Sequence, residues 1–527
     1  MVNDIRGKRE NNSINQVVPL FTSSADAVES INELFSNFCV KRSPFPLFPV
    51  DVPENFRVCN DELIYKLLGN LKTCKSSGSD GIPPLLLKYS ANVLCRPLSH
   101  LINLSFRNGC VPEVLKRADV CPIPKTNPVK RDSLRPISLL PVICKVYEKA
   151  VLKKYYRDFI RCYDSSQYAY RPKSSTVCAL VFIHDFTLRL LELPDIVAVR
   201  ILTFDMTRAF DCVPHHLLLA CISNLDIADR DIFVNWLINY LSERQQRVKL
   251  GETKSSFTNV TSGIPEGSVL GPYLFALYVS AYKAKNSSVG VVKYADDVTL
   301  IVPVYKKDSD SLELIKSEVD HFKSWCCDNK MTINENKTKV LNINFSCTPI
   351  QPVPDFENVI CVKILGLLFN CRPKLSWSNH VDYVISRVSK RLYVLRILKR
   401  ILSHDQLIVV FNSIIRSIIE YASPVFINVG DMLDLKLKAL CKRAFRIIHG
   451  FDVRRYSKCC MLVVSDRRQT LALRLFRQAL LNLNHVLHNL LPKTSHRSQR
   501  LVLPHVRTSR RINGFVFACS LLHNSVL

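Results

Sequence analysis

The spacing of apolar residues along the chain predicts a mixture of helices and strands. Residues 61–72 and 85–109 carry apolar side chains at intervals of three and four, which is typical of amphipathic helices. Asn60 or Asp61 would cap the first of these helices, and Gly109 would end the second. Long helices rich in lysine and arginine are also predicted between residues 380 and 450.

The spacing changes to that of strands from residue 118 onward. The apolar runs 118–125 and 134–140 flank a short basic segment, which predicts a β-hairpin. Residues 197–206 (VAVRILTFDM) are almost continuously apolar and rich in β-branched residues, as in a buried central strand. Residues 289–304 (VGVVKYADDVTLIVPV) predict two strands joined by a polar turn. The fold class is therefore α+β.

The charge balance indicates a polyanionic partner. The 527 residues include 72 Lys and Arg against 45 Asp and Glu, a net charge of +27. Nucleic acid is the first candidate and an anionic membrane surface the second. No apolar run reaches the roughly 18–20 residues of a membrane span, and no secretory signal is visible. We therefore expect a soluble intracellular protein, or one bound to a soluble particle, with no membrane partner.

Cysteine spacing argues against a metal or disulfide framework. None of the 20 cysteines forms a C-x-x-C pair, and the adjacent pairs at 326–327 and 459–460 do not suit zinc. We interpret the cysteines as reduced and mostly buried.

Two adjacent carboxylates in the polar turn are candidate metal ligands. Asp296 and Asp297 repel each other unless a cation relieves the repulsion, and carboxylate oxygens suit Mg²⁺. Taken alone, an ordinary Asp-Asp turn is the simpler interpretation. Asp205, however, ends the buried strand 91 residues earlier. Three carboxylates from two strand ends can hold two metal ions about 4 Å apart and assist phosphoryl transfer.

A series of motifs in a fixed order gives the chain a family resemblance. FDMTRAFDCVPHHLL, SGIPEGSVLGPYLF and YADD resemble the palm motifs of reverse transcriptases. SSGSDGIPPLLLK, PIPK, RPISLL and QYAYRPKSST upstream, and INENKTKVL and KILGLLF downstream, resemble further motifs of these enzymes. The pattern is most similar to non-long-terminal-repeat (LINE-type, jockey-like) retrotransposons, which also have segments like IIEYASPVF and LLHNSVL.

The resemblance implies a right-hand polymerase with fingers, a palm built on an antiparallel sheet, and a helical thumb. It also implies the following division: 1–60, N-terminal extension and linker; 61–104, start of the fingers; 105–370, fingers and palm; 371–450, thumb-like helices; 451–527, a basic helical C-terminal module. This last module has 13 Lys and Arg against two acidic residues. It would bind RNA backbone or, alternatively, serve as a helical cap packed on the thumb.

The implied activity is RNA-directed DNA polymerisation, in which two Mg²⁺ ions, or Mn²⁺ instead, assist transfer of a nucleotide from a dNTP to a primer 3′-hydroxyl. Asp205, Asp296 and Asp297 would hold the metal ions. Lys337 would protonate the leaving pyrophosphate or be a surface lysine. The RNA template, the DNA primer and dNTPs would be the partners, with an endonuclease supplied in trans because residues 1–60 are too short to form one.

The resemblance also implies roles around the nucleotide. Lys125 and Arg135 would bind the triphosphate, and their alternative is a pair of solvated hairpin charges. Phe210 would exclude a ribose 2′-hydroxyl, and its alternative is core packing. The remaining candidates are finger and loop residues near template and nucleotide: Arg171, Gly263, Glu266, Gly267 and Gly271.

Two departures from the family pattern leave a second function open. Glu266 stands where the family usually has Gln, and Lys173 and Ser174 replace a glycine and an arginine of the finger motif. A carboxylate beside phosphates is unfavourable. The alternative is therefore a catalytically inactive remnant that still binds nucleic acid. A group II intron maturase would need a further domain that is not recognisable in 451–527.

Overall fold

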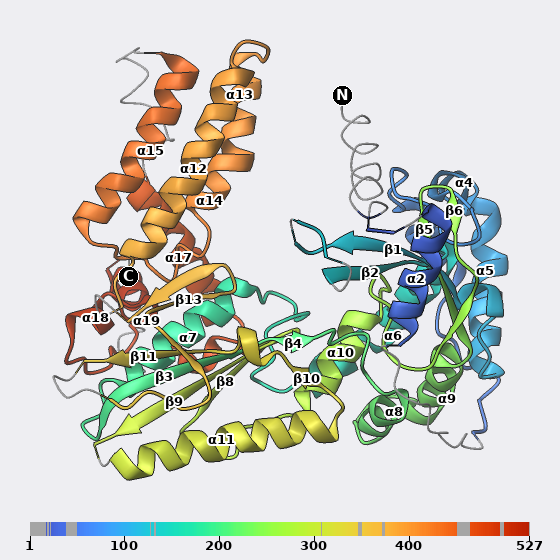
Figure 1. The fold of residues 1–527 in the computed structure, drawn as a ribbon, viewed down its shortest axis with the longest axis horizontal. Helices are drawn as coiled ribbons and strands as arrows, with labels where there is room; N and C mark the ends of the chain where they lie inside the picture. Colours follow the sequence, from blue (N-terminus) through green and yellow to red (C-terminus); the bar gives the residue numbers. More distant parts are fainter. Residues whose placement is uncertain are drawn as a thin grey trace. The chain divides into compact units, whose positions relative to one another are not determined.

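The computed structural model groups the chain into two compact units, each assembled from segments far apart in sequence (Figure 1). The first unit comprises residues 1–164, 206–282 and 324–332, and the second comprises 165–205, 283–323 and 333–527. The described residues are 17, 20–21, 23–37, 50–126, 128–130, 133–306, 308–345, 350–371, 375–450, 464–495 and 500–525. Most of the predicted N-terminal extension and the Cys459–Cys460 pair lie outside them.

The first unit combines helices with a small mixed sheet. Its helices are α2 (Ser24–Ser36), α3 (Asp61–Gly69), α4 (Pro84–Tyr89), α5 (Ala91–Arg107), η2 (Glu113–Lys116), α6 (Val142–Cys162), α8 (His215–Ser223), α9 (Arg230–Leu241) and α10 (Gly271–Ser280). Its strands are β1 (Arg117–Pro124), β2 (Leu134–Leu139), β4 (Met206–Thr207), β5 (Arg244–Leu250), β6 (Thr253–Lys254) and β7 (Thr258–Val260). Strand β1 pairs with β2 antiparallel and with β5 parallel, so the predicted hairpin is confirmed.

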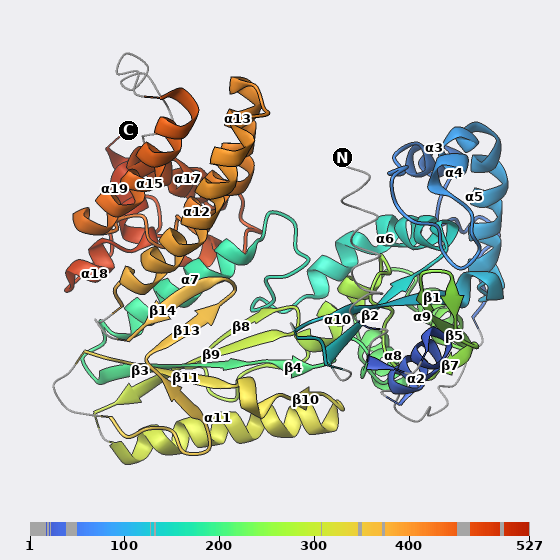
Figure 2. The ribbon, with the colours of Figure 1, turned by 45° about the horizontal axis from the view of Figure 1, so that its top comes forward.

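Local sequence explains where the helices of this unit begin and end. Asn60 accepts a hydrogen bond from the Leu63 amide and so is the cap of α3, which ends at Gly69 rather than at residue 72. Helices α3, α4 and α5 lie side by side (Figure 2). The Phe106 ring on α5 stacks on Trp236 of α9 with ring centres 4.6 Å apart.

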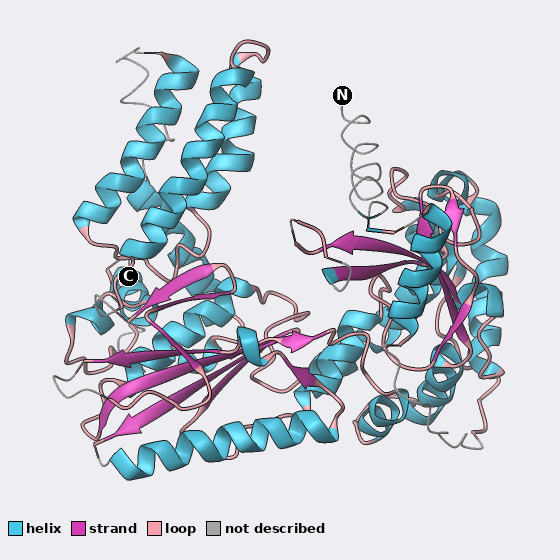
Figure 3. Ribbon diagram, in the orientation of Figure 1, coloured by secondary structure: helices cyan, strands magenta, loops and turns pink. Residues whose placement is uncertain are grey.

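The second unit is built on a five-stranded sheet in the order β12-β11-β3-β9-β8 (Figure 3). Its strands are β3 (Ile196–Phe204), β8 (Gly290–Tyr294), β9 (Asp297–Tyr305), β11 (Lys339–Asn344) and β12 (Glu357–Val359), with a separate hairpin of β13 (Cys361–Ile364) and β14 (Leu367–Asn370). Strand β3 lies between β11 and β9 and is antiparallel to both, which confirms the predicted buried central strand. The predicted pair of strands around the polar turn is β8 and β9.

Helices cover both faces of this sheet. The helices of the unit are α7 (Thr176–Leu190), η4 (Glu335–Lys337), α12 (Ser378–Leu398), α13 (His404–Val410), η5 (Phe411–Arg416), α14 (Ser417–Ile419), α15 (Asp431–His449), α17 (Val464–Leu480), η6 (His488–Leu490), α18 (Ser509–Ile512) and α19 (Phe515–Asn524). Two elements, α11 (Asp308–Asp328) and β10 (Thr332–Ile333), have residues in both units. Figure 1 shows α7 and α11 on opposite faces of the sheet, and Phe204 of β3 packs on Phe322 of α11.

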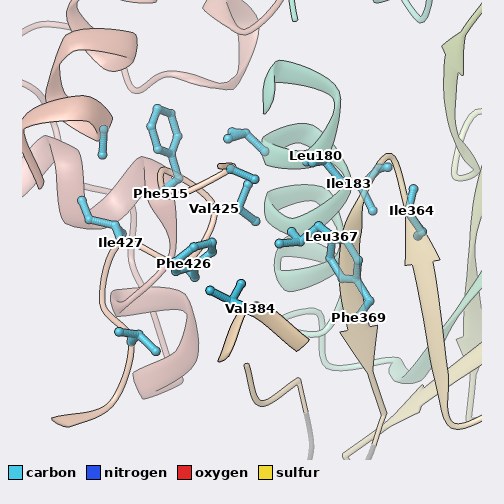
Figure 4. Packing of buried hydrophobic residues seen from close by; sticks show 14 of the residues in the cluster. Leu180, Ile183, Ile364, Leu367, Phe369, Val384, Val425, Phe426, Ile427 and Phe515 are labelled. Carbon is cyan, nitrogen blue, oxygen red and sulfur yellow. The ribbon is translucent and has the colours of Figure 1, made fainter. Parts of the chain in front are cut away.

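A single apolar cluster joins the C-terminal helices to the rest of the second unit. Phe476 of α17 and Phe515 and Cys519 of α19 are fully or almost fully buried and belong to the same cluster as the apolar side chains of α7 and the β13–β14 hairpin. Figure 4 shows this packing around Leu180, Leu367 and Phe515. The described part of the C-terminal region is thus helical, as predicted, and it shares the core of the unit. Among the described residues, no helix has both the length and the apolar character needed to cross a membrane.

Two buried histidines in this core should make the protein sensitive to acid. His184 lies 5.3 Å from the Trp377 ring and His380 lies 5.4 Å from Phe426, and burial lowers the pKa of each to about 4. Unfolded histidine titrates near 6.5, so between these pH values the unfolded chain binds more protons. The free energy of unfolding should therefore fall as pH decreases from 6.5 to 4, by up to roughly 1.4 kcal/mol per pH unit for each histidine.

Urea unfolding at pH 7, 5.5 and 4.5 measures this dependence. His380→Phe keeps an aromatic ring beside Phe426 but cannot take up a proton, so its midpoint should fall less steeply with acid than that of the parent. Equal pH dependence of the two proteins would contradict the assignment.

Candidate active site

The acidic pair lies in a tight turn between two strands. Tyr294 and Asp297 form the last pair of the β8–β9 ladder, and Ala295 and Asp296 make the turn. Ala295 has a φ of +56°, in the left-handed region that non-glycine residues seldom adopt. The turn thus presents two adjacent carboxyl groups at the end of the sheet, as the predicted polar turn between two strands implies.

Strand register brings Asp205 and Lys337 to the same end of the sheet. Phe204 pairs with Val298 in β3–β9, so the next residues, Asp205 and Asp297, stand opposite each other. Lys339 pairs with Thr203 in β11–β3, so continuation of that register brings Lys337 opposite Asp205. The Lys337 Nζ lies 3.0 Å from Asp205 Oδ2, and the Asn334 amide donates to the Asp205 carbonyl at 2.8 Å.

The site carries excess negative charge. The pKa of Asp297 is raised to about 6 by desolvation, then by the charges of Asp296 and Asp205, with Lys337 opposing the shift. The Asp297 side chain is exposed, and the carboxylates of Asp296 and Asp205 repel its charged form. A bound divalent cation would relieve that repulsion.

The oxygen atoms of these carboxylates are suitable ligands for a hard cation. Their present arrangement, however, does not form a metal site. Oxygen ligands from Asp are those that Mg²⁺ prefers. Within the described ranges, no three or more His, Cys, Asp or Glu side chains are grouped so as to hold a metal ion. The Asp205 carboxylate instead pairs with Lys337, as expected when like charges repel and a lysine is within reach. A metal ion would have to compete with this lysine.

The predicted sugar-contacting phenylalanine belongs to the first unit. The Phe210 ring is partly exposed and stacks on Phe275 of α10 with ring centres 4.3 Å apart. The Phe210 carbonyl accepts a hydrogen bond from the Ile264 amide at 2.8 Å. The stacking orients the ring and the hydrogen bond fixes the backbone that carries it, as either a packing role or a role at the nucleotide would require.

The glycines of the loop 262–271 are needed for close backbone packing. Gly263 has a φ of +85°, and a Cβ there would lie 2.6 Å from the Asp211 carbonyl. Gly267 has a φ of +130°, and a Cβ there would lie 2.4 Å from the Ser138 carbonyl. Gly271 begins α10, where a Cβ would meet Ser268 Oγ. The approach of template to this loop stays a prediction.

A charged cluster lies beside this loop. Arg135 on β2 has its Nε 3.6 Å from Glu266 Oε2, with half of the Arg135 side chain exposed. Burial raises the pKa of Asp211 to about 7, Glu266 adds to the rise, and Lys125, Arg208 and Arg135 oppose it. Sequence reasoning named Lys125, Arg135 and Glu266 but missed Asp211. Its place directly after Phe210 in the FDMTRAFD motif was the available signal.

Arg171, which the sequence predicts to be a finger residue, belongs to the second unit, as does the acidic pair. The segment before it attaches to β8, since the Tyr168 amide donates to Lys293 O and the Lys293 amide to Ser166 O. The second unit therefore brings Asp205, Asp296, Asp297 and Lys337 to one end of its sheet. Phe210, Lys125, Arg135 and the loop glycines are held by the first unit.

Comparison with known proteins identifies the framework around these residues. Residues 123–383 match the family described as reverse transcriptase (RNA-dependent DNA polymerase). This part of the chain belongs to the reverse transcriptase family. The match confirms the resemblance inferred from the motifs and, with the sheets and helices described above, the α+β right-hand polymerase class. Reverse transcriptases generally use divalent metal ions.

The curated relatives are proteins of mobile elements. The chain is 26% identical over 296 residues to the RNA-directed DNA polymerase from mobile element jockey of Drosophila melanogaster, covering 54% of this chain and 31% of that protein. It is 23% identical over 414 residues to the jockey protein of Drosophila funebris, covering 74% and 44%. A probable RNA-directed DNA polymerase from transposon BS is 25% identical, covering 67% and 39%. The chain thus spans less than half the length of these relatives.

Solved structures with some likeness include telomerases. Apo telomerase from Candida tropicalis gives a TM-score of 0.38 at 13% identity, covering 73% of this chain and 71% of that chain. Its form truncated from the C-terminal domain gives a TM-score of 0.34 at 15% identity, covering 53% and 59%.

Proposed function

We propose that this chain is an RNA-directed DNA polymerase of a non-long-terminal-repeat retrotransposon. It would transfer a nucleotide from a dNTP to the 3′-hydroxyl of a DNA primer on an RNA template. The observation that carries the proposal is the strand register that aligns Lys337, Asp205 and Asp297 within the segment matching reverse transcriptases. The excess negative charge at this end of the sheet supports a metal-dependent reaction.

The three carboxylates would hold two Mg²⁺ ions, with Mn²⁺ as an alternative. When bound, these ions would activate the primer hydroxyl and stabilise the charge of the leaving pyrophosphate. Lys337, whose side chain is 64% exposed, would give a proton to that pyrophosphate. Its present contact with Asp205 supports a location beside the reacting groups.

The nucleotide would be held by residues of the first unit. Lys125 and Arg135 would bind the triphosphate, since an arginine can hold phosphate oxygens with two parallel hydrogen bonds. Phe210 would exclude a ribose hydroxyl. Gly267 would let the loop backbone approach the nucleotide, with Gly263, Gly271 and Arg171 on the template side.

The domain roles follow the same proposal. Residues 61–104 would begin the fingers, 105–370 would complete fingers and palm, and 371–450 would be the thumb, whose α12 exposes a series of lysines and arginines to the duplex backbone. The protein would act with its RNA as a ribonucleoprotein in the nucleus and cytoplasm.

RNA binding by residues 451–527 remains a narrower proposal. Arg467 pairs with Glu420, and the buried Arg468 pairs with Asp434 at 2.5 Å, so these two arginines serve the fold. Arg474 and Arg477 of α17 are exposed and could contact phosphates. Deleting the whole region would remove part of the core, so substitutions of these two arginines are the suitable probe.

Primer extension tests the proposed function. Purified protein with poly(rA)/oligo(dT), dTTP and Mg²⁺ should extend the primer, and EDTA should stop the extension. A folded protein that binds the duplex but incorporates no nucleotide would overturn the proposal in favour of an inactive nucleic-acid-binding remnant.

Glu266→Gln should raise kcat/KM for dNTP by about tenfold. The Glu266 carboxylate pairs with Arg135, a proposed phosphate ligand, so it competes with the triphosphate for that arginine and also repels it. Gln has almost the same shape without the charge, and a tenfold gain corresponds to about 1.4 kcal/mol of relieved repulsion. Steady-state kinetics would measure this gain, with Glu313→Gln, a substitution at an exposed residue of α11, as the control. Equal kcat/KM for Glu266→Gln and the parent would show that Glu266 does not face the nucleotide.

A further inference from the structure

The first unit contains a recess that shares no residue with the candidate active site. It is lined by the segment that leads into α3 and by one face of α5, two helices that lie side by side in Figure 2. Its volume is about 940 Å³, and its lining residues all lie between positions 57 and 107. Sites that enclose a small molecule typically have volumes of roughly 300–1,000 Å³. The recess is therefore large enough for a ligand of that kind.

Hydrogen bonds within the chain fix the walls of this recess. The Asn103 side chain ties α5 to the segment before α3, since its Oδ1 accepts from the Val58 and Cys59 amides at 2.7 and 3.3 Å. Its Nδ2 donates to the Cys59 carbonyl at 2.9 Å. One turn earlier on α5, the Ser99 hydroxyl donates to the Asp61 carboxylate of α3. The two helices are thus joined at two places, and the recess does not have to be formed by its ligand.

One wall of the recess is basic. Arg96, His100 and Arg107 line it from α5, and their spacing of four and seven residues places them on one face of that helix. Within the described part of the chain, the side chains of Arg96 and His100 have no hydrogen-bond or ion-pair partner. Arg57 and Arg107 both donate to the backbone carbonyl of Glu54 rather than to a carboxylate. Positive charge that is not paired with a carboxylate favours an anionic group, above all phosphate.

A second wall is acidic. Asp61 and Glu62 are the first two residues of α3, and both line the recess. Glu62 pairs with Lys66 at 2.5 Å, whereas Asp61 uses one carboxylate oxygen to accept from Ser99 and has no other hydrogen bond to a described residue. A carboxylate in this place repels a bare phosphate ion. It does, however, accept hydrogen bonds from the hydroxyl groups of a ribose, as acidic residues do at dinucleotide sites.

We propose that this recess binds a ribonucleoside phosphate. The phosphate groups contact Arg96 and His100, and the ribose hydroxyls contact Asp61. The base packs on Leu63 and Leu104, which contribute apolar surface to the recess. The combination of walls decides the ligand class, because an anion without a sugar meets the repulsion of Asp61 and gains nothing from it. Binding of this kind needs neither a metal ion nor a primer, so it is tested separately from the proposed polymerase function.

Calorimetric titration of the whole chain with ADP in EDTA tests the site. Arg96→Gln should raise the Kd at least about tenfold, because it removes a charge-assisted contact with phosphate. Arg157→Gln is the matched control, since Arg157 is an exposed arginine on α6 of the same unit and does not line the recess. Its Kd should equal that of the parent. Both substituted residues are exposed, so the variants should stay folded, which circular dichroism checks.

The role of Asp61 is tested with a change in the sugar. The parent should bind ADP at least about fivefold more tightly than 2′,3′-dideoxy-ADP, because only ADP has hydroxyl groups that Asp61 can bind. Asp61→Ala should remove this preference and leave the affinity for the dideoxy compound no weaker than in the parent. An equal preference in parent and variant would overturn the placement of the ribose.

Three further outcomes would overturn the proposal as a whole. The first is that the folded parent does not bind ADP. The second is that pyrophosphate binds as tightly as ADP, which would make the recess a site for anions in general. The third is that Arg135→Gln weakens ADP binding while Arg96→Gln does not, which would place ADP at the proposed triphosphate ligands. Primer extension by the parent would decide the polymerase function independently of all three.

Discussion

Asp205→Asn is expected to reduce primer extension by about a thousandfold or more while leaving the protein folded. The substitution keeps size and shape but removes the charge with which a carboxylate holds a divalent cation. A thousandfold loss corresponds to about 4 kcal/mol of transition-state stabilisation. The ion pair with Lys337 is largely exposed, so its loss should change the free energy of unfolding by less than about 1 kcal/mol. Single-turnover incorporation of dTTP would measure the rate.

Glu357→Gln is a matched control in the same sheet. Glu357 of β12 pairs with Lys339 of β11 at 3.3 Å, so this variant also breaks a carboxylate–lysine pair between neighbouring strands. Strands β11 and β3 lie between Glu357 and β9, which begins at the acidic turn. Its extension rate should equal that of the parent. Duplex affinity measured in EDTA should be similar for all three proteins. Retention of a tenth or more of the activity in Asp205→Asn would contradict the proposed metal role.

Phe210→Val should admit ribonucleotides while deoxynucleotide use is largely kept. A ring held by stacking on Phe275 and by the Ile264 hydrogen bond to its backbone can exclude a 2′-hydroxyl by bulk, and valine leaves room for it. The ratio of kcat/KM for dTTP to that for UTP should fall by an order of magnitude or more.

Phe210→Tyr tests the same explanation from the other side. Tyrosine keeps the bulk of the ring, so the ratio should stay near that of the parent. If Phe210→Val discriminates as well as the parent, the ring contributes only to packing against α10.

Local patterns were sufficient for the secondary structure around the site. The apolar run before Asp205, the apolar runs on either side of YADD and the two arms of the basic hairpin each predicted strands that the structure contains. These patterns depend on which face of an element is buried. The spacing of apolar residues within that element is enough to indicate the buried face. The order of the motifs along the chain was likewise enough to predict the family, because comparing motifs requires no knowledge of which residues are in contact.

The partners of the charged side chains could not be read from the sequence. The contacts of Lys337 with Asp205 and of Arg135 with Glu266 join residues more than a hundred positions apart, and a one-residue slip of a strand would turn each side chain to the other face. The raised pKa of Asp211 also depends on burial and on charges from three other segments.

The amino-acid sequence was enough to predict the elements and the family, and it supplied the carboxylates that stay candidates for the metal ligands. Only the folded structure shows that Asp205 pairs with Lys337 and that Arg468 forms a buried ion pair with Asp434. It also shows that the Tyr421 hydroxyl donates to the carbonyl of Leu365, which lies 56 residues earlier in a hairpin turn. The physical reason is that apolar spacing is a property of one segment. The position of a hydroxyl or a carboxylate relative to another depends instead on how several segments share one core.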